Sequence, residues 1–414
     1  MNYIDLFAGA GGLSEGFLRA GFKPIAHVEM DAAACYTLKT RLAYHFLKSE
    51  NQLEIYYSYL KGEITRSELY HHIPDNILES VINLSIGPEN NETIFSLISE
   101  LLNNKEVDLI IGGPPCQAYS LVGRARSADG MKSDPRNHLF VQYAGYLEKY
   151  KPKLFVFENV LGLKSAKKGT YLANMKKLFL KKGYTMKLYT LTANNFGVLQ
   201  NRRRIIILGI RNDINIELPD LELIQLQSDF KVESIFNDLP FINAGEGNDK
   251  YLNYKTEIND YLAQKSIRNG IDILTQHIAR PQCDQDKEIY RIAVNKWNNK
   301  NQRLDYNDLP EYLKTHKNRE SFFDRFKVVA QNLNFSQTVV AHIAKDGHYY
   351  IHPDIEQNRS ISVREAARLQ SFPDDFYFEG VKEGKNRTAA FKQIGNAVPP
   401  LMALTIANSI KHLL

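Results

Sequence analysis

The sequence predicts an α/β fold built on a parallel sheet, followed by a second and more irregular region. Over the first 210 residues, short runs of β-favouring apolar residues alternate with longer amphipathic stretches. This alternation is the pattern of βαβ units around a parallel sheet. After Arg211 the alternation stops, and Asn, Asp, Gln and Lys accumulate as far as Ser362. At 414 residues the chain is long enough for a large core and for more than one domain.

The period of the apolar residues places the individual elements in order. We expect strands at residues 3–7, 23–29, 107–112, 153–158, 185–191 and 204–210. The stretches between them predict helices at 13–20, 32–47, 93–102, 138–150 and 172–182. Helical spacing returns at 363–370, which Pro373 ends, and again from Pro400 onward. Residues 48–90, rich in Tyr, Glu and Lys, are expected to form a helical insertion on the surface.

Composition narrows the class of protein without deciding it. The net charge of +5 allows a nucleic-acid partner but is too small to establish one. The three cysteines, Cys35, Cys116 and Cys283, have spacings that fit neither a disulfide framework nor a zinc site, so we expect a reducing compartment and no metal. No signal peptide follows Met1, and no apolar stretch reaches about 18 residues. We therefore expect a cytoplasmic protein that does not contact membranes.

A lone thiol follows a stiff turn at Gly112-Gly113-Pro114-Pro115-Cys116-Gln117. Two consecutive prolines fix φ at both positions, so the cysteine after them is presented in one orientation. The turn follows an apolar strand, and the carboxyl edge of a parallel sheet is where α/β enzymes place reactive groups. Cys116 is therefore a candidate nucleophile. A buried, inert cysteine is the alternative at this point.

A glycine-rich turn follows the first predicted strand at Asp5-Leu6-Phe7-Ala8-Gly9-Ala10-Gly11-Gly12-Leu13. Glycines let the backbone approach a ligand closely, and the helix that follows offers unpaired amide donors. Glu29 ends the next strand about 20 residues further on, where a carboxylate can accept both hydroxyls of a ribose. The two features predict an adenosine-type cofactor, and their spacing would also fit NAD.

Two further groups are expected at the same edge as Cys116. Glu158 closes the apolar strand that ends with Phe157, and its carboxyl could protonate a heterocycle nitrogen while a thiol attacks the ring. A helix-capping role is the alternative for Glu158. Strand alternation is expected to send Arg202 and Arg204 to one face, where they could hold a phosphate or a carbonyl oxygen. A basic strand entrance that only meets solvent is the alternative for these arginines.

In order along the chain, these segments resemble the motifs of the DNA cytosine-5 methyltransferases of bacterial restriction-modification systems. The matching segments are Asp5-Leu6-Phe7-Ala8-Gly9-Ala10-Gly11-Gly12, Pro114-Pro115-Cys116-Gln117, Glu158-Asn159-Val160, Gln200-Asn201-Arg202-Arg203-Arg204, Arg364-Glu365-Ala366-Ala367-Arg368-Leu369-Gln370 and Gln393-Ile394-Gly395-Asn396-Ala397-Val398-Pro399-Pro400. The resemblance implies a Rossmann-like, S-adenosylmethionine-dependent methyltransferase domain at 1–212 and 379–414. It also implies a smaller, irregular, mostly β target-recognition domain with a hinge at 213–378. The C-terminal block should then return to pack beside the first strand.

The resemblance implies a covalent mechanism on a cytosine flipped out of duplex DNA. Cys116 would add to C6, Glu158 would protonate N3, and Arg204 with Arg202 would hold O2 and a nearby phosphate. The small, basic segment 120–136 would close over the DNA as a mobile lid. The implied DNA contacts are Gln117, Ser120, Arg124 and Arg126. The implied cofactor contacts are Asp5, Phe7, Ala8, Gly9, Gly11, Gly12, Leu13, Glu29, Met30, Pro115, Leu139, Asn396 and Ala397.

The chain departs from the family pattern mainly around the adenine of the cofactor. An acidic residue usually follows the third strand there, and the segment from Leu84 to Glu89 does not identify its counterpart. Met30 stands where a larger aromatic residue is common, and Leu199 where a proline is common. The segment 339–348 is expected to be framework, and DNA reading is expected between about Glu233 and Phe335.

The expected partners are double-stranded DNA and, functionally, a cognate restriction endonuclease. One alternative is an RNA cytosine-5 methyltransferase, whose tRNA-acting members carry a Cys-Phe-Thr signature that this chain lacks. A non-catalytic DNA-binding regulator is the other alternative, and the intact Cys116, Glu158 and Arg204 argue against it.

Overall fold

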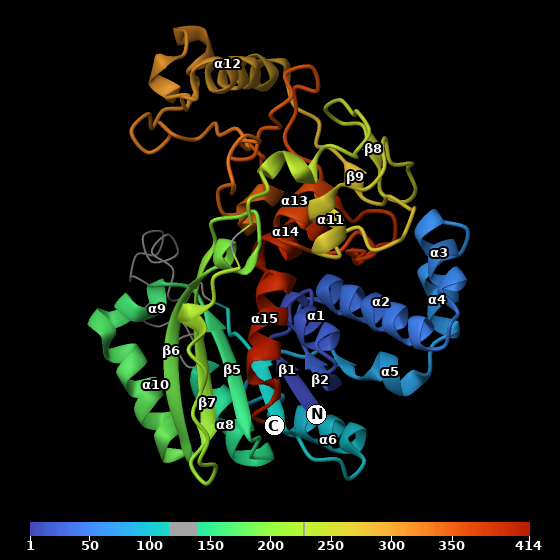
Figure 1. Cartoon of the computed structure of the whole chain (residues 1–414), viewed down its shortest axis with the longest axis vertical. Helices are drawn as coiled ribbons and strands as arrows, with labels where there is room; N and C mark the ends of the chain where they lie inside the picture. The colour runs from blue at the N-terminus through green and yellow to red at the C-terminus, as the bar shows by residue number, and fades with distance from the viewer. Residues whose placement is uncertain (116–138, 227) are drawn as a thin grey trace.

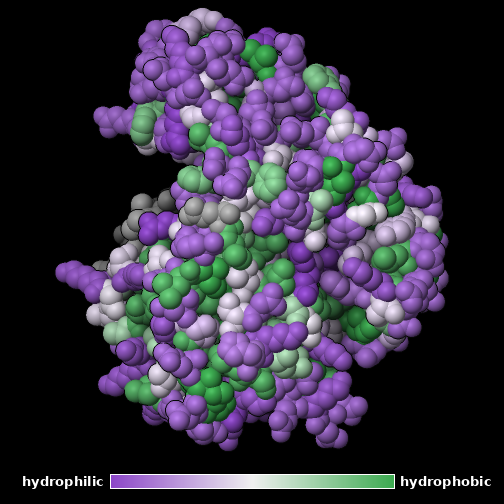
Figure 2. All heavy atoms as spheres, viewed as in Figure 1, coloured by the Kyte–Doolittle hydropathy of each residue, from purple (hydrophilic) through white to green (hydrophobic). Residues whose placement is uncertain are grey.

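The computed structural model describes residues 1–115, 139–226 and 228–414. Figure 1 shows two lobes, one built on a sheet with helices on both faces and the other carrying α11 to α14. The space-filling view is hollowed on the left, between the α12 part of the second lobe and the sheet lobe (Figure 2). Within the described ranges, no helix has the length and apolar character needed to cross a membrane.

The sheet has the strand order β3-β2-β1-β4-β5-β7-β6. Its strands are β1 (Asn2–Leu6), β2 (Lys23–Val28), β3 (Val81–Ile82), β4 (Leu109–Gly112), β5 (Leu154–Asn159), β6 (Tyr184–Thr192) and β7 (Arg203–Arg211). The strands from β3 to β5 in this order pair in parallel, but β7 is antiparallel to both β5 and β6. The prediction of a parallel sheet is therefore wrong for β7, whereas β6 runs in the same direction as β1 to β5. The connection between β6 and β7, residues 193–202, is shorter than the dozen or more residues that a parallel crossover needs.

Helices cover both faces of the sheet, and most lie where the sequence predicts them. They are α1 (Gly12–Arg19), α2 (Ala32–Ser49), α6 (Asn91–Leu102), α8 (Leu139–Tyr150), α9 (Gly162–Ser165), α10 (Thr170–Lys181) and α15 (Pro400–Lys411). One core cluster joins α6, α8 and α10 to one face, and another joins α1 and α15 to the other. A Cβ on Gly16 would lie 2.3 Å from the Leu404 amide nitrogen, so α1 and α15 touch backbone to backbone. The expected return of the C-terminus to the first strand is confirmed.

The insertion is helical, as predicted, but it is more than a surface addition. It comprises α3 (Leu53–Lys61), α4 (Arg66–His71) and α5 (Asp75–Glu79), and it leads into the short strand β3. Tyr56, Tyr59 and Leu60 share one face of α3 and are fully buried. They pack with Ile273 and Tyr377, which belong to the second lobe.

The second lobe is irregular, as predicted, but the prediction that it is mostly β is wrong. Its strands among the described residues are β8 (Gly247–Asn248) and β9 (His277–Ile278), and its helices are α11 (Asp260–Gln264), α12 (Asp284–Lys300), α13 (Val363–Leu369) and α14 (Arg387–Asn396). This region lacks the alternation of apolar and polar residues that strands require. Helix α14, which was not predicted, packs on α13 and on the short helix η9.

Short 3₁₀ helices complete the structure. They are η3 (Ala166–Gly169), η4 (Ala193–Phe196), η5 (Leu221–Leu223), η6 (Val232–Ile235), η7 (Tyr306–Asp308), η8 (Glu311–Leu313) and η9 (Ala341–Ala344). The segment predicted as framework contains η9. A Cβ on Gly395 would lie 2.2 Å from the Ala341 amide nitrogen, so α14 rests directly on this segment.

Candidate active site

The carboxyl ends of β1, β4 and β5 meet at one edge of the sheet. Leu6 pairs with Gly112, and Gly112 pairs with Phe157. The residues that follow these strands therefore lie side by side, as expected for parallel strands. Cys116 lies outside the described residues, and so do the implied DNA contacts Gln117, Ser120, Arg124 and Arg126 and the predicted lid. The last described residue before them is Pro115, which is exposed.

The turn that leads to Cys116 packs directly against the end of β5. A Cβ on Gly113 would lie 2.4 Å from the Glu158 carbonyl oxygen and 2.8 Å from Glu158 Oε2, so only glycine fits there without displacement. Asn159 Nδ2 donates a hydrogen bond of 3.2 Å to the carbonyl oxygen of the buried Pro114. These contacts fix the positions of Gly113 and Pro114, which come shortly before the cysteine in the chain, relative to Glu158.

Glu158 and Arg204 form an ion pair at this edge. Arg204 Nε lies 2.8 Å from Glu158 Oε1, and the two side chains are 12% and 15% exposed. A second donor of Arg204, Nη1, binds the carbonyl oxygen of Arg203. The carboxylate is thus held between a guanidinium on one side and the Gly113 turn on the other, while it keeps some access to solvent.

Arg202 does not join this pair, and its predicted place on the catalytic face is wrong. Its side chain is fully buried, with Nη1 donating to the Val339 carbonyl at 2.6 Å and Nη2 to the Gly395 carbonyl at 3.1 Å. Strand β7 begins only at Arg203, so strand alternation does not extend to position 202. Arg202 instead ties the connection between β6 and β7 to the end of α14 and to the segment that contains Val339.

Gln200 reinforces the same junction. Its Nε2 donates to the Leu369 carbonyl at 2.9 Å and to Gln370 Oε1 at 3.0 Å. Its Oε1 accepts the Val339 amide at 2.8 Å. Gln200 and Arg202 of this motif are therefore structural, and Arg204 alone of the two predicted arginines stands beside Glu158.

The glycine-rich turn and Glu29 face each other across the ends of β1 and β2. The Gly9 amide donates to Glu29 Oε2 at 2.8 Å, and the Asp31 amide donates to Oε1 at 2.8 Å. Burial raises the pKa of the Glu29 carboxyl, and these amide hydrogen bonds act in the opposite direction. Phe7 has φ 58° and Gly9 has φ 56°, both in the left-handed region. A Cβ on Gly9 would meet nothing within 4 Å, so the turn borders open space.

The C-terminal block completes this part of the edge. A Cβ on Gly12 would lie 2.4 Å from the Val398 carbonyl oxygen, so the turn touches the segment that contains Asn396 and Ala397. Asn396 is exposed and Ala397 is 9% exposed. Leu13, in contrast, is buried in the core under α1, which makes it a packing residue. These placements join both ends of the chain at one site.

Asp5 supplies an unusual feature at the same place. Its carboxyl is buried, and its Oδ2 has no hydrogen-bond partner among the residues that the structure describes. Burial raises the pKa of Asp5 well above its ordinary value, and the charge of Glu29 adds to this effect. An orphaned carboxyl oxygen beside a second carboxyl and an open glycine turn fits a cofactor that carries positive charge.

Asn83 belongs to this site although the sequence did not single it out. It follows β3 directly, and its Nδ2 donates to the carbonyl oxygens of Glu29 at 3.0 Å and Met30 at 3.1 Å. The Met30 side chain is 66% exposed beside it. A strand of only two residues leaves too short a pattern to be found in the sequence. Leu139, also implied as a cofactor contact, begins α8.

A sheet with this strand order, carrying a glycine-rich turn after β1 and an ion-paired carboxylate on the same edge, is the arrangement of a Rossmann-like methyltransferase. The family model of C-5 cytosine-specific DNA methylases matches residues 1–59 and 83–412. The chain therefore belongs to this family and is a DNA cytosine-5 methyltransferase, which confirms the resemblance. Family membership implies S-adenosylmethionine as the methyl donor.

Similar proteins support the same placement. The Type II methyltransferase M.Bpa9945I of Bacillus paralicheniformis is 44% identical over 448 residues, covering 100% of this chain and 99% of the relative. The Type II methyltransferase M1.HphI of Haemophilus parahaemolyticus is 30% identical and covers 99% of this chain and 86% of the relative.

Two solved structures share the fold. A prophage-encoded E. coli protein, described as a candidate DNA modification methyltransferase, has a TM-score of 0.65 at 22% identity. The S. pombe Dnmt2 methyltransferase has a TM-score of 0.53 at 13% identity. Each comparison covers 100% of this chain and 99% of the other chain. At these identities the likeness supports the fold alone.

Proposed function

We propose that this methyltransferase modifies C5 of a cytosine flipped out of a specific duplex DNA sequence, through a covalent adduct with Cys116. The observation that carries the proposal is the packing of the Gly113 turn on Glu158, which is itself paired with Arg204. This packing brings the turn that leads to the nucleophile within contact distance of the proton donor.

The chemistry follows from the weakness of an aromatic C5 as a nucleophile. The Cys116 thiolate adds to C6 while the Glu158 carboxyl protonates N3, and C5 then acquires enamine character. Bound S-adenosylmethionine supplies the electrophilic methyl group. A base, such as water, then removes the C5 proton, the bond between C6 and the Cys116 sulfur breaks to release the thiolate, and N3 returns its proton to Glu158. Arg204 holds Glu158 in place and binds the cytosine O2.

The residues around the glycine-rich turn are proposed to hold the cofactor. Glu29 accepts the ribose hydroxyls, and the exposed Met30 packs against the adenine. Asn83 is a candidate for the adenine amino group, because its amide oxygen can act as the acceptor that an acidic residue usually provides. The buried Asp5 Oδ2, which makes no hydrogen bond within the described residues, is proposed to face the cationic part of the cofactor. The remaining proposed contacts are Phe7, Ala8, Gly9, Gly11, Gly12, Pro115, Leu139, Asn396 and Ala397.

The wider role is that of the modification enzyme of a restriction-modification system. Support comes from the Type II methyltransferases among the relatives. We propose that residues 213–378 read the DNA sequence and that the sheet lobe forms the catalytic domain. In that role the enzyme acts in the cytoplasm on double-stranded DNA and protects sites from a cognate endonuclease. The match to the DNA methylase family disfavours both an RNA substrate and a non-catalytic regulator.

The proposal is tested by methyl transfer from labelled S-adenosylmethionine to duplex DNA and to tRNA. Transfer to DNA and not to tRNA is expected, and bisulfite sequencing of plasmid from expressing cells should show one recurring sequence. Cys116→Ala should abolish transfer while cofactor binding survives. Cys283→Ala is the matched control, because Cys283 is exposed at the start of α12. Turnover by Cys116→Ala, or transfer to tRNA alone, would overturn the proposal.

A further inference from the structure

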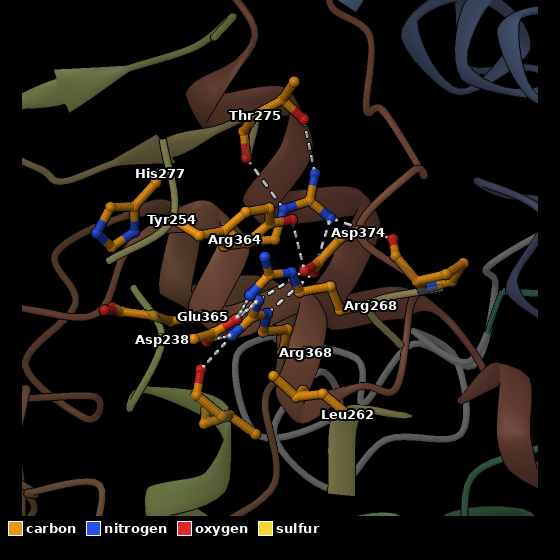
Figure 3. Close-up of polar contacts among 12 residues, drawn as sticks. Asp238, Tyr254, Leu262, Arg268, Thr275, His277, Arg364, Glu365, Arg368 and Asp374 are labelled. Carbon is orange, nitrogen blue, oxygen red and sulfur yellow. Dashed lines mark hydrogen bonds and ion pairs between the residues drawn. The ribbon is translucent and has the colours of Figure 1, made fainter. Parts of the chain in front are cut away.

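The loop between α13 and α14, residues 372–381, carries carboxylates that face opposite lobes; we call it the joint loop. Asp374 belongs to the second lobe. Its Oδ2 accepts Arg368 Nη2 at 2.6 Å and the Tyr254 hydroxyl at 2.9 Å. Arg368 also binds Asp238, and all four side chains converge in the second lobe (Figure 3).

The next residue is attached to the sheet lobe. Asp375 Oδ1 accepts Arg41 Nη1 from α2 at 2.9 Å, and Arg41 Nη2 lies 2.6 Å from Glu15 Oε1 on α1. The Asp375 carbonyl accepts the Tyr56 hydroxyl of the insertion at 2.7 Å. These side chains are buried, so neither ion pair is screened by solvent. Asp375 Oδ2 also accepts Asn269 Nδ2 of the second lobe at 2.6 Å, so Asp374 binds the second lobe and the residue after it bridges both lobes.

The insertion binds the other end of the joint loop through hydrogen bonds and an ion pair. Glu379 Oε1 accepts hydrogen bonds from Thr40 at 2.8 Å and from the Tyr59 hydroxyl at 2.5 Å. Arg66 lies 3.4 Å from Glu379 Oε2 and donates to the carbonyls of Gly380 at 2.8 Å and Val381 at 3.1 Å. Its guanidinium also lies over the Tyr36 ring of α2, 3.7 Å from the centroid.

A cation from the second lobe completes the contact. Lys250 Nζ lies 3.6 Å from the centroid of the Tyr59 ring and 4.6 Å from that of the Tyr377 ring. It also donates to the Tyr59 carbonyl at 3.2 Å. Tyr59 therefore contacts the joint loop through its hydroxyl and the second lobe through its ring face.

These contacts lie on the side of the molecule opposite the hollow, where they can restrict the angle between the two lobes. Helices α3 and α4 lie on the right of the molecule in Figure 1, whereas the hollow between the lobes opens on the left in the same view (Figure 2). Any change in the angle between the lobes has to move the buried pairs on the closed side. Residues 60–82, which include Arg66 but not Tyr59, fall between the two stretches that match the family, so the Arg66 contacts come from a segment outside the family model.

We propose that the insertion positions the second lobe: Arg66 and Tyr59 fix the joint loop and thereby set the affinity for DNA, although neither residue touches DNA or cofactor. The kinetic part of this inference rests on the proposed function. If the lobes are already fixed before DNA binds, less conformational entropy is lost on binding, and the affinity for DNA is higher.

The test compares Arg66→Ala with Lys61→Ala, an exposed position of the same insertion. With plasmid DNA as substrate, Arg66→Ala should raise the KM for DNA about fivefold or more, while kcat and the KM for S-adenosylmethionine stay unchanged. Arg66→Lys should recover part of the loss, because it keeps the charge but not the guanidinium fork. Lys61→Ala should behave as wild type.

A second readout does not depend on activity. Small-angle X-ray scattering of the unliganded protein should give a larger radius of gyration for Arg66→Ala than for wild type or Lys61→Ala. If Arg66→Ala fails to fold, Tyr59→Phe replaces it in both measurements, since it keeps the buried ring and removes only the bond to Glu379. An unchanged KM for DNA, or an equal change in every kinetic constant, would overturn the inference. If wild type transfers no methyl group to DNA, the proposed function fails, and scattering alone then decides on the positioning role.

Discussion

Replacing Gly113 by Ala should slow the chemistry and leave the cofactor site intact. The added Cβ would lie 2.4 Å from the Glu158 carbonyl oxygen, and real Cβ contacts essentially never fall below 3.0 Å. The two groups must therefore separate by about 0.6 Å, and the Cβ also presses on Glu158 Oε2. Misplacing a reacting group by about 1 Å can cost about 100-fold in rate. We accordingly expect kcat to fall between about 10-fold and 100-fold, which corresponds to about 1.4 to 2.7 kcal/mol in activation free energy.

The assay is single-turnover methyl transfer to plasmid DNA, with calorimetry of S-adenosylmethionine binding in parallel. Gly145→Ala in α8 is the matched control, because a Cβ there meets nothing within 4 Å. The control should keep its rate, and both variants should bind the cofactor as wild type does. A Gly113→Ala enzyme with the wild-type rate would refute the argument that this turn positions Glu158.

Three further changes test other parts of the account. Arg202→Ala leaves the buried carbonyls of Val339 and Gly395 without the donors that Arg202 supplies. Urea titration should therefore show a loss of about 3 kcal/mol in unfolding free energy, and an unchanged unfolding free energy would contradict the structural role of Arg202. Glu29→Gln should weaken S-adenosylmethionine binding about tenfold by calorimetry, and unchanged affinity would remove Glu29 from the ribose site. Stability should fall as the pH drops from 6.5 toward about 4, because burial lowers the pKa of His277 to about 4 against the opposing charge of Glu365. The unfolded chain gains this proton first, so His277 alone contributes about 1.4 kcal/mol per pH unit to the slope. The slope should be flatter by about that amount in His277→Gln, and equal slopes would contradict this role of His277.

Sequence reasoning worked well where local pattern decides structure. The strands that end at Leu6, Gly112 and Asn159 were predicted within a residue or two, because each is a compact apolar run closed by a turn signal. The same runs placed the glycine-rich turn, Glu29 and Glu158 at one edge, since parallel strands share the side on which they end.

The errors arise where structure depends on contacts distant in sequence. Strand β7 lies between β5 and β6 in the sheet. Its direction is set by the short connection from β6, whereas the prediction assumed that every strand is joined to the next by a helix. Arg202 was assigned by extending the alternation of β7 by one residue, but its partners are backbone carbonyls from far along the chain. The burial of Tyr59 depends in the same way on the joint loop, and no local pattern contains it.

The most direct test of the central claim is mass spectrometry of the enzyme after reaction with duplex DNA that contains 5-fluorocytosine in place of cytosine. Fluorine at C5 blocks the final elimination, so wild type and Cys283→Ala with S-adenosylmethionine should form a stable adduct whose cross-linked peptide contains Cys116. Cys116→Ala should form none. An enzyme that methylates ordinary DNA but forms no adduct, or forms one through another residue, would contradict the covalent mechanism.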